Sequence, residues 1–291
     1  MITPSVLAGR ARYERVMDGW TDNTHDDAFT HTVRLVEPER TVELSAVALP
    51  SPEYVIRDAR ARAEGDVDPA AVAAIPRLAG VRMVGGLTRA AAEAVGRGPG
   101  GALLVDAVVE VARLARQVAK LPRDQAERAS GGAAECWTLD TTGWIDLPDS
   151  CFTYSAAGRA LLGTRTVVSP MQPDLYSPRP GQTRVFVRRK VARVERVDGT
   201  LRLFHSMHDN VHGFDLTYEI DATTGRITRA ESVTSRLPYA GICSEPQGRI
   251  KALVGETVDA GLRKRVSGLV GGASGCAQLF DLTADVLKLL A

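Results

Sequence analysis

Two stretches of this chain repeat each other at a constant separation. Residues 78–115 align without a gap on residues 253–290, with an offset of 175 positions (253 − 78). The glycines shared by the two stretches are Gly80 with Gly255, Gly86 with Gly261, Gly96 with Gly271 and Gly100 with Gly275. A repeat of this length indicates an internal duplication. We therefore expect two tandem copies of one unit, packed as an intramolecular pseudo-dimer.

A shorter polar element also occurs twice. Residues 22–25 read Asp-Asn-Thr-His, and residues 209–212 read Asp-Asn-Val-His. Asp and Asn favour turns because their side chains bond to their own backbone, so the repeat could be inherited turn chemistry. A shared functional role is the other interpretation, and the sequence supports the two equally.

Period-two alternation of apolar and polar residues predicts the strands. In the first copy this pattern covers residues 29–35 and 41–49, and a strand over residues 10–16 is expected to turn at Asp18-Gly19. The second copy has four such segments, over residues 183–196, 200–207, 214–220 and 226–233. The first two of these meet at Asp198-Gly199, a dipeptide typical of hairpin turns.

Helices follow the strands in each copy. Asp68-Pro69 predicts a helix start, because proline suits the first turn behind a capping residue. Further helices are predicted over residues 86–95 and after Gly101 in the first copy, and over residues 257–269 with Thr257 as the cap in the second. The fold class is therefore α+β, with antiparallel sheets and packed helices. We expect a first copy over residues 1–120, a connector over 121–180 and a second copy over 181–291.

Charge and composition exclude some functions. The chain has 36 Lys and Arg against 35 Asp and Glu, a net charge of +1, so nothing indicates a nucleic-acid or acidic-membrane partner. Neither an export signal nor a membrane span is recognisable, and four cysteines in 291 residues do not make a disulfide framework. We expect a cytoplasmic protein with a small-molecule substrate, and leave a homo-oligomer open.

The last predicted helix places Cys276 in its first turn. A thiol at a helix N-terminus feels the positive end of the dipole, so we expect a lowered pKa for Cys276 and a thiolate suited to metal ligation or nucleophilic attack. Cys136 and Cys151 lie in the connector without a partner pattern, and we interpret them as inert loop thiols.

The order of parts in the second copy resembles the NifU/IscU-like iron-sulphur scaffold superfamily. In that family one cysteine occupies a turn between strands, a second follows in a Gly-Cys motif, and a third opens a late helix in a Cys-Ala-x-Leu context. His212 falls on the turn cysteine, Cys243 on the second and Cys276 on the third. The segments around Cys243 and Cys276 also resemble a bacterial family of unknown function. The overlap covers roughly residues 203–291.

This resemblance implies a metal site formed by His212, Cys243 and Cys276. Because the turn cysteine is replaced by histidine, two thiolates and an imidazole suit mononuclear zinc or iron better than an iron-sulphur cluster. Asp209 is then either a fourth ligand or the carboxylate that orients His212. His205 and His208 face opposite sides of their strand, so at most one of them should lie near His212.

Three functions follow as hypotheses. The leading one is a metal-assisted hydrolase, lyase or isomerase acting on a small molecule, with Asp209 or Glu245 as the proton carrier. Its metal-free variant uses Cys276 as nucleophile and His212 as base. The alternatives are an iron-sulphur or sulphur-transfer scaffold, and a non-catalytic binding module with structural thiols.

Overall fold

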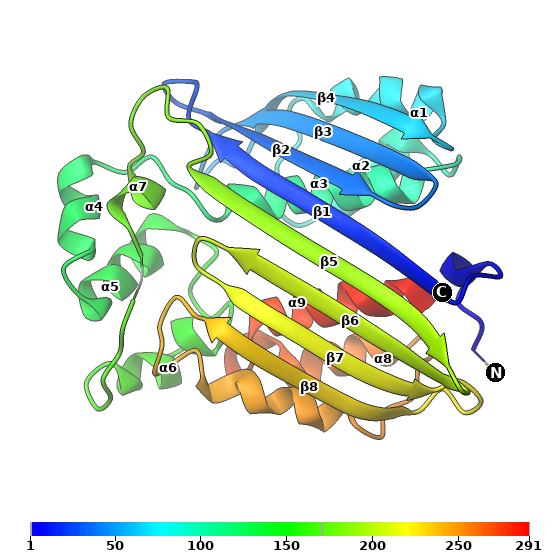
Figure 1. The fold of residues 1–291 in the computed structure, drawn as a ribbon. Helices are drawn as coiled ribbons and strands as arrows, with labels where there is room; N and C mark the ends of the chain where they lie inside the picture. The colour runs from blue at the N-terminus through cyan, green and yellow to red at the C-terminus, as the bar shows by residue number, and fades with distance from the viewer. Residues whose placement is uncertain (1, 170, 291) are drawn as a thin grey trace. The chain divides into compact units, whose positions relative to one another are not determined.

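The computed structural model describes residues 2–169 and 171–290. Over these residues eight strands follow the order β4-β3-β2-β1-β5-β6-β7-β8 in one antiparallel sheet (Figure 1). The predicted combination of helices with an antiparallel sheet is therefore confirmed. In the same residues none of the helices has the length and apolarity that a membrane span requires.

The chain divides into two compact units, each assembled from separate segments. The amino-terminal unit consists of Arg15–Ser130 and Gln172–Arg189. The carboxy-terminal unit consists of Met1–Glu14, Gly131–Met171 and Lys190–Ala291. Much of the expected connector thus belongs to the same unit as the last strands and helices.

In the amino-terminal unit an antiparallel meander is covered by helices on one face (Figure 1). Its strands are β1 (Arg12–Asp22), β2 (Phe29–Val36), β3 (Arg40–Ala48) and β4 (Ile56–Gly65). Its helices are α1 (Pro69–Ala74), η2 (Ile75–Leu78), α2 (Leu87–Val95), α3 (Gly101–Ala115), α4 (Arg123–Ala129) and α7 (Pro173–Tyr176). The side chain of Asp68 caps α1 by accepting from Ala70 N at 2.9 Å, as predicted.

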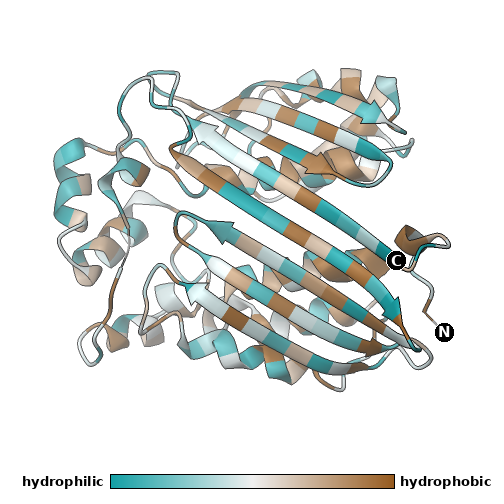
Figure 2. Ribbon diagram, viewed as in Figure 1, coloured by the Kyte–Doolittle hydropathy of each residue, from teal (hydrophilic) through white to brown (hydrophobic). Residues whose placement is uncertain are grey.

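Alternation along the strands creates the core of this unit. Val33 and Leu44 are fully buried and directly opposite each other in the β2–β3 pair, while Arg34 and Glu43 point to the other face. Figure 2 shows this alternation as bands of polar and apolar colour along the strands. Helix α3 contacts β2 and β3 and buries Leu104 and Val108 among its apolar residues.

The predicted turn at Asp18-Gly19 is wrong, because β1 runs straight through both residues. Gly19 pairs with Val33 in the ladder, so it lies in a strand interior. A Cβ atom at Gly19 would lie 3.0 Å from a methyl group of Leu114 on α3. Glycine here lets the helix approach the sheet closely, a role that sequence cannot distinguish from a turn.

Strand β4 was missed by the sequence pattern. Its residues alternate arginine with alanine, as in Arg60, Ala61 and Arg62, and it lies at the edge of the strand order. Alanine contributes little to an apolar–polar alternation, and charged residues are common on edge strands. The sequence of this segment therefore lacks the pattern that predicts a strand.

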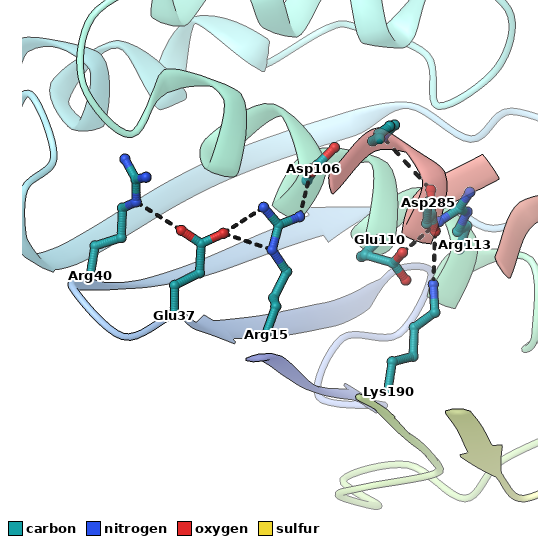
Figure 3. A network of polar contacts seen from close by, with 9 residues as sticks. Arg15, Glu37, Arg40, Asp106, Glu110, Arg113, Lys190 and Asp285 are labelled. Atoms are coloured by element: carbon teal, nitrogen blue, oxygen red, sulfur yellow. Dashed lines mark hydrogen bonds and ion pairs between the residues drawn. The ribbon is translucent and has the colours of Figure 1, made fainter. Parts of the chain in front are cut away.

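An ion-pair network joins β1 to the β2–β3 turn and to α3 in this unit. Arg15 Nε donates to Glu37 at 2.7 Å, and its Nη1 donates to Asp106 at 2.8 Å. Arg40 Nε holds the second oxygen of Glu37 at 2.8 Å. Figure 3 shows Arg15 between the two carboxylates, with Arg40 on the other side of Glu37.

In the carboxy-terminal unit four strands are again followed by helices, and other helices precede the strands in the chain. Its strands are β5 (Phe186–Val197), β6 (Thr200–Asp209), β7 (Gly213–Asp221) and β8 (Ile227–Arg236). Its helices are η1 (Ser5–Leu7), α5 (Ala133–Gly143), η3 (Phe152–Tyr154), α6 (Ala156–Leu161), η4 (Glu245–Leu253), α8 (Leu262–Val270), η5 (Gly272–Ser274), α9 (Ala277–Leu287) and η6 (Lys288–Leu290). Leu203, Leu216 and Tyr218 pack with Val266 and Leu282 in its core.

The expectations for this unit are confirmed for the strands and revised for the helices. Asp198 and Gly199 take positive φ angles of 45° and 78°, as a hairpin turn of this type requires. Thr257 does not cap a helix, because it forms an isolated bridge with Arg226 and α8 begins only at Leu262.

The two polar elements of four residues occupy different places in their units. Asp22 ends β1 and leads into β2, whereas Asp209 ends β6 and leads into β7. The first therefore follows the first strand of its unit, and the second follows the second strand. The two elements therefore have different places in the strand order of their units, and the inheritance of one element from a common ancestor stays a prediction.

Candidate functional site

The turn between β6 and β7 is organised by the carboxylate of Asp209. Its Oδ1 atom accepts the backbone N–H of Val211 at 2.7 Å and that of His212 at 2.6 Å. The side chain of Asp209 is fully covered, so these amides satisfy a charge that water does not reach. This is the turn chemistry that an Asp-Asn pair favours.

The same carboxylate also holds the imidazole of His212. Nδ1 of His212 lies 3.2 Å from both Oδ1 and Oδ2 of Asp209, and 11% of the His212 side chain is exposed. If Nδ1 carries the proton, that proton points at the carboxylate, and the hydrogen bond fixes the orientation of the ring. The orienting role expected for Asp209 requires a contact of this kind. The choice between that role and the role of fourth ligand stays a prediction.

Residues of β6, β7, β8 and α9 surround this pair. Arg236 at the end of β8 donates through Nη1 to the backbone carbonyl of Asp209. On the more exposed side, His208 Nε2 lies 3.2 Å from Asp215, a second carboxylate–imidazole pair. His205 instead is buried, with Nδ1 2.8 Å from the carbonyl of Leu282 on α9. The opposite orientations expected for His205 and His208 are confirmed.

Cys243 is a buried, hydrogen-bonded thiol. Its Sγ atom lies 2.9 Å from the hydroxyl of Thr153, and its backbone amide donates to Tyr239 at 2.9 Å. Burial raises the pKa of the Cys243 thiol to about 12, with a smaller opposing effect from the Thr153 hydroxyl. The thiol is therefore protonated at neutral pH.

Cys276 contradicts the expectation of a lowered pKa. It is the N-cap of α9 instead of a residue of the first turn, and burial raises its pKa to about 11. The backbone amides of Leu279 and Gln278 act in the lowering direction, as predicted, but their effect is smaller than that of desolvation. Desolvation in the apolar surroundings therefore outweighs the effect of the helix terminus on the pKa of Cys276.

The structure adds a residue that sequence reasoning set aside. Phe152 N donates to Gly275 O at 2.8 Å, so the segment that carries Cys151 lies against the loop before Cys276. Cys151 also contributes to the raised pKa of both Cys243 and Cys276. The segments that carry Cys151, Cys243 and Cys276 therefore lie against one another in the carboxy-terminal unit. No spacing in the chain predicts this, since 92 residues (243 − 151) separate Cys151 from Cys243.

A carboxylate with two phenol partners lies beside the thiols. Tyr154 OH donates to Asp140 Oδ2 at 2.7 Å, and Tyr239 OH donates to the same oxygen. Tyr239 also reaches Cys136 Sγ at 3.2 Å, so the second connector cysteine has a defined buried place. Burial, followed by the charge of Asp140, raises the pKa of Tyr154.

The expected metal ligands do not form a ready site. In residues 2–169 and 171–290, no group of three or more His, Cys, Asp or Glu side chains is arranged to hold a metal ion. Nδ1 of His212 is occupied by Asp209, and both thiols favour their protonated forms. The ligand set of His212, Cys243 and Cys276 stays a prediction.

Glu245 lies in the first turn of η4 and pairs with Arg165 at 2.7 Å. Half of its side chain is exposed, and Arg165 also donates to the carbonyl of Gly241. The contacts of Glu245 are those of a surface ion pair, and its proposed role as proton carrier stays a prediction.

The first polar element has a different neighbourhood. Asn23 is buried and its side-chain amide donates to the carbonyls of Pro178 and Arg179 at 3.1 and 2.8 Å. His25 is exposed. Residues 22–25 therefore bind a loop through Asn23, whereas residues 209–212 form a carboxylate–imidazole pair.

The comparison with known protein families gives one match, which covers part of the chain.

A family model described as a protein of unknown function (DUF2889) matches residues 184–290.

The matched region contains Asp209, His212, Cys243, Glu245 and Cys276. No curated protein and no solved structure matches the chain. Nothing in these comparisons links the chain to the NifU/IscU-like superfamily, so that resemblance also stays a prediction.

Proposed function

We propose that the protein is an enzyme that acts on a small molecule by proton transfer at His212. The observation that carries this proposal is the hydrogen bond between His212 Nδ1 and the fully covered carboxylate of Asp209. A covered carboxylate is costly unless its partners are fixed, and here two backbone amides fix it. The arrangement is typical of a histidine whose tautomer is set for acid–base chemistry.

The chemistry assigned to each residue follows from this geometry. His212 exchanges a proton through Nε2, and Asp209 holds the ring and stabilises the imidazolium that forms when the proton is taken up. Positioned general acid–base catalysis of this kind contributes about 10²–10⁴-fold to a rate. Asp209 acts through His212, and is therefore a positioning residue.

In this proposal the thiols have a structural role. Cys243 and Cys136 are buried and hydrogen-bonded to Thr153 and Tyr239. Because their pKa values are raised, the thiols of Cys243 and Cys276 are protonated and therefore poor nucleophiles at neutral pH. This disfavours the metal-free hypothesis in which Cys276 is the nucleophile.

Two measurements test the proposal without knowledge of the natural substrate. Long-range ¹H–¹⁵N spectra at pH 8 should show His212 with its proton on Nδ1, and the Asp209→Asn variant should lose that preference. Hydrolysis of p-nitrophenyl acetate, an activated ester that imidazole cleaves, should fall at least tenfold in His212→Gln.

His25→Gln is the matched control, because His25 is exposed and has no carboxylate partner within hydrogen-bonding distance in the described chain. Equal hydrolysis by the parent, His212→Gln and His25→Gln would overturn the proposal. A His212 ring protonated on Nε2 in the parent would do the same.

The second candidate function is metal-dependent catalysis with zinc or iron at the thiols. The nearness of the segments that carry Cys151, Cys243 and Cys276 supports it, because thiolates are ligands that these metals prefer. A metal would have to displace the thiol protons and rearrange the side chains. Metal analysis of protein purified without oxygen or chelator tests it, with Cys243→Ser and Cys276→Ser beside Cys136→Ser as control. A brown colour after iron and sulphide reconstitution would instead support the scaffold alternative.

We also infer that the two units arose by duplication and form a pseudo-dimer. The bounds of α8 lie 175 residues after those of α2 (262 − 87 and 270 − 95), the offset of the sequence repeat. The burial patterns of β4 and β8 are identical, and each strand pairs with its neighbour through a register shift. An experimental structure in which residues 78–115 fail to superpose on 253–290 would refute the inference.

A further inference from the structure

A polar cleft lies in the amino-terminal unit, and none of the described residues that line it is assigned to catalysis. Its volume is about 230 Å³, large enough for a small metabolite. The residues that matter for its chemistry are Thr24, His25, Asp26, Lys120 and Ser177. They come from the β1–β2 turn, from the segment after α3 and from the loop after α7.

The walls of the cleft are fixed by hydrogen bonds through Asn23. The Asn23 side chain donates to Pro178 and Arg179, and its backbone exchanges bonds with Gln182 and Gly181 at 2.8 and 2.9 Å. The turn and the loop are therefore held together before any ligand arrives. A preorganised cleft binds with little ordering cost.

Lys120 brings a positive charge whose partners are neutral. Its ammonium donates to the amide oxygen of Asn23 and to the backbone carbonyl of His25, and it lies 4.6 Å from the ring centroid of Phe29. Among the described residues no carboxylate lies within ion-pair distance of it. Burial lowers the pKa of Lys120, and the more distant Asp27 and Asp26 oppose this. An anionic group would find a partly buried cation here.

Asp26 brings the opposite charge to the same cleft. The neighbouring Asp27 is engaged by both guanidinium nitrogens of Arg57, at 2.7 and 2.5 Å, so it is not available to a ligand. Asp26 lines the cleft and is exposed. Among the lining residues that the structure describes, His25 is the only other titratable group. A purely anionic ligand would be repelled by Asp26, and a purely cationic one by Lys120.

We infer that this cleft binds a small zwitterion of the amino-acid type, with its carboxylate on Lys120 and its ammonium on Asp26. The two charges of the ligand then each meet an opposite charge, and Thr24 and Ser177 offer hydroxyls to either group. This site is independent of the proposed chemistry at His212, so neither proposal depends on the other.

The test uses three probes that differ only in their charged groups, namely glycine, acetate and methylammonium. Binding is followed by chemical-shift changes of the backbone amides of residues 24–26 and 120 in the full chain. Glycine should bind at least tenfold more tightly than either single-charge probe, because only glycine can pair with both Lys120 and Asp26 at once.

Variants of Asp26 and Lys120 test the contribution of each charge to binding separately. Asp26→Asn should lower glycine affinity to that of acetate, and Lys120→Met should lower it to that of methylammonium, while Lys120→Arg keeps most of it. Asp66→Asn and Lys264→Met, which lie outside the cleft lining, are the controls. Because Asp26 is exposed, Asp26→Asn remains informative even if Lys120→Met fails to fold.

Three results would overturn the inference. They are the absence of saturable shifts with glycine, equal affinity for glycine and acetate, and glycine binding that Asp26→Asn leaves unchanged.

Discussion

The carboxylate of Asp209 lies between the backbone amides of its own turn and the imidazole of His212, with Nδ1 3.2 Å from each carboxylate oxygen. One side chain therefore both shapes a turn and orients a titratable ring. Stability and function are coupled at this position, and the two can be separated by choosing which partner is removed.

Replacing Asp209 by alanine should destabilise the protein by about 1–3 kcal/mol, because two buried amides lose their acceptor. His212→Gln should cost less, since it leaves those amides bonded. Asp221→Ala is a matched control, because Asp221 makes the same kind of turn with Thr223 and Thr224 on an exposed surface. Urea denaturation measures all three, and equal losses for Asp209→Ala and Asp221→Ala would contradict the prediction.

The thiols should react slowly in the folded protein. The pKa of Cys276 is raised from 9.0 to about 11, so at pH 8 its thiolate fraction and alkylation rate should be about 100-fold below those of the unfolded chain. Iodoacetamide labelling followed by peptide mass analysis measures this, with 6 M urea as the reference. Rapid native labelling of Cys276 would restore the original expectation of a helix-activated thiolate.

The same shifts predict a loss of stability in alkali. The folded state holds the protons of Cys243 and Cys276 more tightly than the unfolded state, so their stabilising effect is complete below pH 9 and is lost as the pH rises toward 11 to 12. Cys243→Ala should flatten the plot of unfolding free energy against pH in this range. Cys136→Ala, which removes a thiol at another buried position, serves as the comparison. Parallel profiles for parent and Cys243→Ala would contradict the assignment.

His31 should make the protein sensitive to acid. It is fully buried on β2 with Nδ1 2.9 Å from the hydroxyl of Thr21, and no polar group of the described chain bonds to its Nε2. Burial lowers the pKa of His31 from 6.5 to about 3, so its effect on stability is complete above pH 6.5 and is lost as the pH falls toward 3, by about 1.4 kcal/mol per unit.

The variant His31→Leu should remove this slope between pH 6 and 4, and His25→Gln, which changes an exposed imidazole, should keep it. Unfolding free energies measured across this range give both slopes. A slope in His31→Leu as steep as in the parent would show that another group is responsible.

The network around Glu37 should contribute to stability. Only 4% of the Glu37 side chain is exposed, and it is held by both Arg15 and Arg40. Glu37→Gln should therefore cost about 1–3 kcal/mol. Glu93→Gln, which breaks an exposed pair with Arg89, should change the unfolding free energy by no more than about 0.5 kcal/mol. Thermal and urea denaturation of the two variants should differ accordingly.

Local chemistry explains which elements were predictable. Strands such as β2 and β3 carry strict alternation, and α1 has both its cap and its proline, so their signals lie within a few neighbouring residues. Gly19 has the local pattern of a turn, but its role is set by Leu114 on a distant helix. β4 is an edge strand of alternating arginine and alanine with little apolar pattern of its own. It is held in the sheet by antiparallel pairing with β3.

The candidate site divides in the same way. Asp209 and His212 are three residues apart, so their hydrogen bond is a property of one turn and could be anticipated from the sequence. The pKa of Cys276 could not, because the amides of α9 are local whereas the burial that outweighs them comes from packing. The position of Cys151 beside Cys243 likewise depends on chain folding across many residues.

The sequence by itself determined the period of the strands, the capping of α1, the turn chemistry at Asp209 and the 175-residue repeat. The tertiary structure alone decided which thiols are desolvated, which histidine is neutral, and which cation of the amino-terminal unit lies in a cleft. The physical reason is that turns and periodicity arise from neighbours along the chain, whereas desolvation depends on groups that only folding brings together.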